Sequence, residues 1–312
     1  MTVLITGGNG FVGRNLIQEL YKYRRVFGDV INVSRRDFKS PFVAKSYICD
    51  LGFSDDSEAQ FYGLRYIMRQ HNPEYIFHLA SKATVKMEEN EPFDIIQDNI
   101  LSTQKVCQWS PKGSKVVLAS SVIVYGDWIF EQESPRPYIE TDRTEPTSIY
   151  GMTKRASEGI IRYHNSTGQI NGVSARMCAT VGRGLTHGVV YDFMKKILKN
   201  PVLEALGSKP GSTKPYCYIN DLIQALLILS MNDSAVGEYN VVPDDAINIE
   251  EVAKAVMGGL EVYKNVKWLG EKSNWKGDNR LISTDNSKLK NLGWTPEYKS
   301  KEAIVQAVKD IA

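Results

Sequence analysis

The sequence has few of the residues that build metal centres, disulfide scaffolds or surfaces for charged polymers. It contains four cysteines and four histidines in 312 residues, and their spacing matches no zinc or other metal motif. We therefore expect no metal and reduced thiols, as in a cytoplasmic protein. The 38 basic residues are balanced by 36 acidic ones, so the charge predicts neither nucleic-acid nor membrane-surface binding.

Long apolar runs and a targeting segment are also lacking. No stretch approaches the ~20 apolar residues needed to span a bilayer. Met1 leads directly into "TVLIT", with no basic segment followed by an apolar one, so no secretory signal is expected. The prediction is a cytoplasmic protein with no membrane partner. Its length allows about two domains or one large α/β body.

What the sequence does contain is a regular alternation of short apolar runs and helical segments. The expected strands are "TVLIT", "VINVS", "ICDLGF", "YIFHLA", "KVVLASS" and "GVSARM". The expected helices are 15–23, 61–70, 92–109, 150–165, 189–199, 219–229 and 249–257. Alternation of this kind predicts βαβ units. We expect an α/β fold in which residues 1–175 form a Rossmann-type, doubly wound parallel sheet.

After about Arg176 the pattern loosens into loops and separated helices. This part is too poor in strands for a second complete sheet. We expect residues 176–312 to form mainly a smaller C-terminal domain that covers a substrate. Some of its segments are expected to return to the Rossmann body.

A glycine-rich loop joins the first strand to the first helix in "LITGGNGFVG". Glycines allow a tight turn and close approach of a pyrophosphate, and the helix N-terminus offers free N–H groups. A glycine pattern alone often marks a plain turn, but the strand before it and the helix after it favour a dinucleotide site. Residues 1–175 are thus predicted to bind NAD(P). The loop residues expected to contact the cofactor are Gly7, Gly10, Phe11, Val12 and Gly13.

The end of the second strand bears on the choice of cofactor. Ser34 stands where an acidic residue would bind the ribose diol of NAD, and Arg35 and Arg36 follow. Guanidinium groups suit a 2′-phosphate, so NADP is favoured over NAD. The alternative is that both arginines are solvated loop charges while Asp37 reaches back to the ribose.

Two further strand ends are expected at the cofactor. Asp50, followed by Leu51, could accept a hydrogen bond from the adenine amino group. Small residues at the end of "YIFHLAS" would let the cofactor lie close; these are Leu79, Ala80 and Ser81. Either end could also be a simple strand terminus.

Polar side chains suited to proton transfer follow later in the chain. Ser120 and Ser121 end an apolar strand, and an isolated pair of this kind most often only terminates the strand. Tyr150 and Lys154 stand four residues apart in "YGMTK" and share one helix face. A lysine ammonium beside a phenol favours the phenolate, so Lys154 is expected to lower the pKa of Tyr150. A Tyr and a Lys at this spacing are usually an ordinary helix surface.

Taken together, these motifs resemble a known family. "TGGNGFVG", "HLAS", Asn99, "SSVIVYG", "YGMTK" and "NLGWTP" follow the order and spacing of the extended short-chain dehydrogenase/reductases, the nucleotide-sugar epimerase and dehydratase group. The resemblance covers essentially the whole chain. It implies a homodimer that acts on a nucleotide-activated hexose.

The resemblance also implies roles for individual residues. Ser121 would be the catalytic hydroxyl, Tyr150 the acid/base and Lys154 its ribose-binding, charge-tuning partner, while Ser120 is structural. Asn99, Tyr150 and Lys154 would also contact the cofactor. The expected substrate contacts are Lys82, Thr84, Ser121, Val122 and Lys214.

Departures from the family pattern narrow the reaction. Dehydratases of this group carry an acidic pair or a Ser-Glu pair after the catalytic hydroxyl, where this chain has Val122 and Ile123. Neither side chain can transfer a proton, so dehydration is rejected. Ala179 replaces a substrate-binding Asn, and Lys214 and Trp275 replace phosphate-binding arginines, which leaves the nucleotide open.

Three functions remain. The first is a 4-epimerase acting at carbon 4 of the hexose, and the second is an NADPH-dependent 4-keto-sugar reductase. The third is a non-catalytic dinucleotide-binding sensor or structural subunit. Such a protein would typically have lost the Tyr or the Lys, and this chain keeps both Tyr150 and Lys154.

Overall fold

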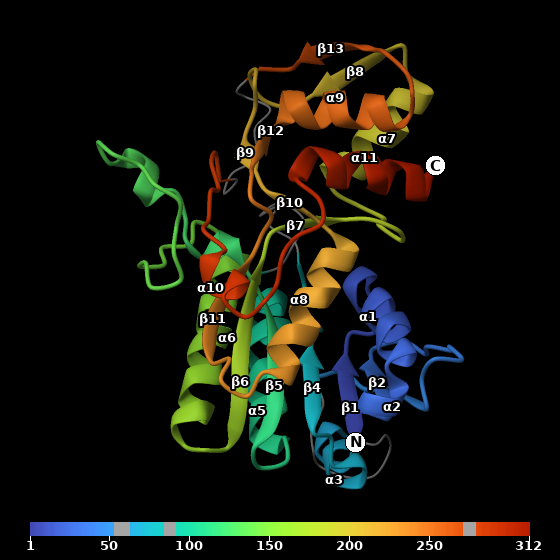
Figure 1. Cartoon of the computed structure of the whole chain (residues 1–312), viewed down its shortest axis with the longest axis vertical. Helices are drawn as coiled ribbons and strands as arrows, with labels where there is room; N and C mark the ends of the chain where they lie inside the picture. Colours follow the sequence, from blue (N-terminus) through green and yellow to red (C-terminus); the bar gives the residue numbers. More distant parts are fainter. Residues whose placement is uncertain (53–62, 84–91, 271–278) are drawn as a thin grey trace. The chain divides into compact units, whose positions relative to one another are not determined.

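A computed structural model describes residues 1–52, 63–83, 92–270 and 279–312. Within these residues a seven-stranded sheet has the order β11-β6-β5-β4-β1-β2-β3 (Figure 1). Its strands are β1 (Thr2–Thr6), β2 (Asp29–Ser34), β3 (Lys45–Ile48), β4 (Tyr75–His78), β5 (Ser114–Ser121), β6 (Ile170–Met177) and β11 (Gly237–Val241). The pairs β1/β2, β1/β4, β2/β3 and β4/β5 are parallel. The predicted Rossmann-type α/β fold is confirmed.

Helices connect these strands and cover both faces of the sheet. In β1, Val3, Leu4 and Ile5 are all buried, as expected of a parallel strand covered on both sides. The helices of this region are α1 (Phe11–Lys22), α2 (Arg24–Phe27), α3 (Leu64–His71), α4 (Pro92–Ile96), the π-helical η2 (Gln97–Leu101), α5 (Ser102–Trp109) and α6 (Ile149–Ser166). Side chains from α3, α5 and α6 join one buried cluster with Leu4 of β1. Helix α1 packs on β2.

The described residues group into two compact units. The first contains 1–121, 148–176 and 226–239, and the second contains 122–147, 177–225 and 240–312. Residues 122–147 therefore group with the C-terminal part, although they precede residue 175. The functions assigned to the two domains stay predictions.

The second unit is built from helices and short strand pairs. Among the described residues its sheets have two strands each, pairing β10 with β7, β12 with β9, and β13 with β8. The strands are β7 (Ala179–Val181), β8 (Val202–Ala205), β9 (Thr213–Lys214), β10 (Tyr216–Tyr218), β12 (Ile247–Asn248) and β13 (Asn265–Trp268). The remaining helices are η3 (Val122–Val124), η4 (Trp128–Glu131), α7 (Val189–Lys199), α8 (Ile219–Met231), α9 (Ile249–Gly259), α10 (Ser287–Lys290) and α11 (Ser300–Ile311). Of these, α8 continues into the first unit.

The "NLGWTP" motif anchors the second unit. Trp294 is 1% exposed, and its indole Nε1 donates to the carbonyl oxygen of Asp221 at 2.9 Å. The Asp221 carboxylate accepts from the backbone N–H groups of Glu297 and Tyr298. The motif thus has a packing role. No helix in the described ranges is both long and apolar enough to cross a bilayer.

Candidate active site

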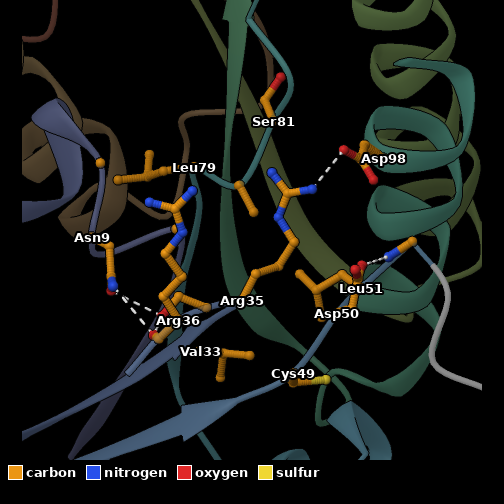
Figure 2. A pocket seen from close by; sticks show the side chains of 15 residues that line it. Asn9, Val33, Arg35, Arg36, Cys49, Asp50, Leu51, Leu79, Ser81 and Asp98 are labelled. Atoms are coloured by element: carbon orange, nitrogen blue, oxygen red, sulfur yellow. Dashed lines mark hydrogen bonds and ion pairs between the residues drawn. The ribbon is translucent and has the colours of Figure 1, made fainter. Parts of the chain in front are cut away.

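A cavity of about 510 Å³ opens beside the glycine loop in the first unit (Figure 2). Gly7 has φ +76°, and a Cβ there would lie 2.8 Å from the backbone N of Ala80. Only glycine fits this close approach. Helix α1 begins after Gly10, and no side chain of the described residues caps it. Its first N–H groups can therefore donate hydrogen bonds to an anion. These features fit a dinucleotide diphosphate.

Most of the cofactor-binding residues predicted from sequence line this cavity. They are Gly7, Gly10, Ser34, Arg35, Arg36, Asp50, Leu51, Leu79, Ala80 and Ser81. The lining does not include Phe11, Val12, Gly13, Asn99, Tyr150 or Lys154. Gly13 has a packing role instead, because a Cβ there would lie 2.5 Å from the carbonyl oxygen of Gly7.

Five lining residues were not predicted: Asn9, Val33, Cys49, Gly52 and Asp98. Asn9 lies between predicted glycines, and Val33 and Cys49 each precede a predicted residue, so extending the strand ends by one residue would have found them. Asp98 has only the weaker signal of its place next to Asn99.

The loop after β2 is fastened to the glycine loop. The Asn9 amide donates to the carbonyl oxygens of Arg36 and Asp37, each at 3.2 Å. The Ser34 hydroxyl lies 2.8 Å from the Arg36 carbonyl oxygen and 2.9 Å from Asn9 Oδ1. These bonds fix the backbone from which both arginines project.

The two arginines have different surroundings. Arg35 Nη1 donates to Asp98 Oδ2 at 3.1 Å, and Figure 2 shows its guanidinium turned toward that carboxylate. In the same view the Arg36 guanidinium lies on the side of Asn9 and Leu79. Burial raises the pKa of Asp98, while Arg35 acts in the opposite direction.

The predicted catalytic side chains come together at the end of β5 and the start of α6. The Ser148 side chain caps α6 by accepting from the N–H of Gly151 at 3.1 Å. The half-buried Tyr150 follows in the first turn and shares a hydrogen bond with the Ser121 side chain. One turn later, Lys154 is 4% exposed and donates to the Ala119 carbonyl oxygen at 2.7 Å.

The pKa of Tyr150 shifts in the direction opposite to the expectation from sequence. Burial raises it to about 12, although the hydrogen bond with Ser121 acts to lower it. Lys154 Nζ lies 5.6 Å from the centre of the Tyr150 ring. The expected lowering of this pKa by Lys154 is therefore wrong for this arrangement, because the loss of hydration around the phenol disfavours the phenolate.

The pKa of Lys154 is lowered toward neutral pH. Burial lowers its pKa to about 7, while the nearby Glu158 acts to raise it. Near neutral pH the side chain therefore loses its proton far more readily than an exposed lysine does. Burial thus favours the uncharged forms of both Tyr150 and Lys154.

A buried ion pair lies further along α6, between Glu158 and Arg176. Arg176 on β6 donates through Nε and Nη2 to the two oxygens of Glu158, at 2.9 and 2.8 Å. The Ser120 hydroxyl donates to Glu158 Oε1 at 2.6 Å. Because the Glu158 and Arg176 side chains are 1% and 3% exposed, this is an internal bidentate pair. The contacts of Ser120 fit the structural role expected for it.

Comparison with known proteins identifies the family of this chain. A sequence model of the NAD dependent epimerase/dehydratase family matches residues 3–242. The chain belongs to this family. It is therefore an NAD(P)-dependent enzyme of the extended short-chain dehydrogenase/reductase type.

Individual members of the epimerase/dehydratase family align along nearly the whole chain. UDP-glucuronic acid decarboxylase 6 of Arabidopsis thaliana is 26% identical over 319 residues, covering 97% of this chain and 87% of that protein. The dTDP-4-dehydro-6-deoxyglucose reductase of Escherichia coli is 25% identical over 331 residues, covering 99% and 97%. The crystal structure of a UDP-galactose 4-epimerase matches with a TM-score of 0.80 at 26% identity, covering 99% and 98%.

Asn99 is buried and forms hydrogen bonds with several residues, and it does not line the cavity. Its Oδ1 accepts from the Ser81 hydroxyl at 3.0 Å and from the backbone N of Lys82 at 2.8 Å. Its Nδ2 donates to Thr153 Oγ1 at 2.9 Å. Asn99 therefore ties the segment after β4 to α6, and a direct cofactor contact stays a prediction.

The predicted substrate residues are divided between the two units. Lys82, in the first unit, pairs with Asp94 at 2.9 Å. Val122 is buried and Lys214 lies on β9, both in the second unit. Thr84 and Trp275 lie outside the described residues. The substrate contacts stay predictions.

Proposed function

We propose that this enzyme transfers hydride at carbon 4 of a nucleotide-activated hexose, as a 4-epimerase. The observation that carries the proposal is the Ser121–Tyr150 hydrogen bond, with Lys154 one turn along the same helix. A nicotinamide cofactor bound in this cavity would supply the hydride chemistry at carbon 4. Relatives whose names specify UDP-galactose or UDP-glucose 4-epimerases support the substrate class.

The protein's own groups handle the proton. In its phenolate form, Tyr150 takes the proton of the 4-hydroxyl as the carbon–hydrogen bond breaks, and the resulting phenol gives that proton back when the ketone is reduced on its other face. Ser121, bonded to Tyr150, orients the sugar oxygen. Val122 and Ile123 follow Ser121 and have no proton to exchange, which supports a reaction without dehydration.

A 4-keto-sugar reductase is the second candidate, and two observations favour it. The raised Tyr150 pKa of about 12 keeps the phenol protonated at neutral pH, which is the form that donates a proton to a ketone. Arg35 and Arg36 line the cavity, and guanidinium groups suit the 2′-phosphate of NADP. NADP preference is part of this proposal, and the reductase from Escherichia coli is a relative of matching name.

The deciding experiment incubates the full chain with NAD or NADPH and a panel of sugars. The panel contains UDP-glucose, UDP-galactose, UDP-glucuronic acid and dTDP-4-dehydro-6-deoxyglucose. A 4-epimerase inverts carbon 4 with no net change in nicotinamide absorbance, whereas a reductase consumes NADPH with the keto sugar. Release of carbon dioxide from UDP-glucuronic acid, or of a 4-keto-6-deoxy sugar from a hexose, would replace both assignments.

We also propose that the enzyme forms a homodimer through its α4–α6 surface. Phe93 and Met152 are 69% and 51% exposed, and Ile96 and Leu101 also lie open. These apolar side chains lie on α4, η2 and α6, which contact one another. Light scattering of the parent and of Phe93→Glu/Met152→Glu tests this, since a dimer using the surface should dissociate in the variant.

A further inference from the structure

Three chain segments meet at one side of the cavity around Asp98. Arg35, just after β2, donates to Asp98 Oδ2 at 3.1 Å. Gly52, after β3, lies so close that an added Cβ would be 2.8 Å from Asp98 Oδ1. Its N–H donates to Asp50 Oδ1 at 3.0 Å. Asp98 is therefore held by Arg35 and lies close to Gly52, and together with Asp50 it places two carboxylates on this wall of the cavity.

Arg36 differs from Arg35 although the two are adjacent in sequence. The Arg36 backbone is fastened by Asn9 and Ser34, yet its guanidinium is exposed and has no ion-pair partner within the described residues. Figure 2 shows the two guanidinium groups diverging, with only that of Arg35 directed at Asp98. One arginine is therefore engaged by a carboxylate and the other is available to an anion.

We propose that Asp98 limits the preference for NADP by withholding Arg35 from a 2′-phosphate, so that Arg36 alone binds that group. The inference rests on the proposed use of the cavity for NAD(P). A guanidinium already bonded to a carboxylate has fewer donors to offer a phosphate, and Asp98 adds a negative charge on the same side. Asp98 is thus a positioning residue that acts through Arg35 and moderates a preference for NADP.

The test measures the affinities of NAD and NADP by titration calorimetry for the parent and five variants. Arg36→Ala should weaken NADP by roughly 10–100-fold, the value of a charge-assisted hydrogen bond, and leave NAD unchanged. Arg35→Ala should alter both affinities by the same factor. Asp98→Asn should raise NADP affinity relative to NAD by several-fold, and added salt should reduce this gain.

The double variant Arg35→Ala/Asp98→Asn tests transmission through Arg35. If Asp98 acts by occupying Arg35, the gain from Asp98→Asn disappears when Arg35 is absent. Asp94→Asn is the matched control, because it removes a carboxylate one turn earlier that pairs with Lys82 and does not line the cavity. It should leave the NADP/NAD ratio unchanged. If Asp98→Asn fails to fold, Asp98→Ser takes its place.

The outcomes separate this inference from the proposed function. If the parent binds neither NAD nor NADP, the cavity assignment itself fails. If both bind but Asp98→Asn leaves their ratio unchanged, the specificity role of Asp98 is overturned while the cofactor site stands. A gain that persists in the Arg35→Ala background would also overturn it, because Asp98 would then repel the phosphate directly.

Discussion

Charged side chains of the first unit occur in two settings that differ in exposure to water. At the cavity, the Arg35 side chain is 59% exposed and pairs with Asp98. Along α6 and β6, Lys154, Glu158 and Arg176 are all 4% exposed or less. Exposed ion pairs contribute little to stability, whereas a buried charge is costly unless every partner is in place. Charges at the cavity can therefore be changed to alter binding, whereas removing one of the buried charged groups near the predicted catalytic tyrosine leaves its partner unpaired.

The largest expected effect comes from removing the hydroxyl group of Tyr150. Tyr150→Phe keeps the ring and its packing, so folding and cofactor binding should survive. Turnover should fall by about 10²–10⁴-fold, as is typical when general acid/base catalysis is lost. Initial rates with the active sugar from the panel measure it. Tyr163→Phe, an exposed tyrosine on the same helix, is the control and should keep full activity; full activity in Tyr150→Phe would exclude the mechanism.

The next largest effect concerns the buried ion pair. Glu158→Gln leaves Arg176 buried without its counter-charge, which should lower the free energy of unfolding by about 3–5 kcal/mol. Urea denaturation followed by circular dichroism measures it. The matched control is Glu238→Gln, which removes the carboxylate paired with the half-exposed Arg162 and should cost about 1 kcal/mol or less. Equal losses in the two variants would show that burial is not what distinguishes the two settings.

The third prediction concerns the pH dependence of stability. The pKa of Lys154 is lowered from 10.5 to about 7, so between these values the unfolded chain holds a proton that the folded chain lacks. The parent should therefore gain stability as pH rises from about 7 to 10, by a few kcal/mol over that range. Lys154→Met removes this contribution, and its unfolding free energy should rise less steeply.

Thermal or urea unfolding across that pH range compares the two slopes. Lys301→Met, on an exposed side chain of α11, should retain the slope of the parent. Lys154→Met should also lose activity and bind the cofactor more weakly, because the Lys154 ammonium is assigned to both proton transfer and ribose binding. Identical slopes for the parent and Lys154→Met would contradict the burial argument.

The smallest expected effect lies at the phosphate loop. Among the described residues, a Cβ at Gly10 would meet only the Gly7 carbonyl oxygen, at 3.2 Å, and the Gly10 φ of −74° suits any residue. Gly10→Val should therefore fold. Its valine side chain would enter the cavity and weaken cofactor binding at least about tenfold, or about 1.4 kcal/mol. Gly13→Ala is the contrast: its Cβ would lie 2.5 Å from backbone, so it should lower stability. Unchanged affinity in Gly10→Val, measured by calorimetry, would remove the loop from the site.

The positions of the helices and strands were largely predictable from sequence, because they depend on local patterns. The run "TVLIT" forms β1, and residues 189–199 form α7 with the bounds expected. Helix α1 begins at Phe11, four residues before the expected start, because the helix continues directly from the glycine loop. Predicted strand ends also placed most of the cavity wall, since parallel strands bring their carboxyl ends to one edge.

The sequence by itself determined the fold class, the glycine loop and the four-residue spacing of Tyr150 and Lys154, since each is set by neighbours in the chain. Only the tertiary structure decided which charges meet and how much water they keep. It pairs Arg35 with Asp98, 63 residues away, and Glu158 with Arg176 on another element. It also reverses the expected pKa shift of Tyr150, because desolvation depends on side chains that pack from distant parts of the chain.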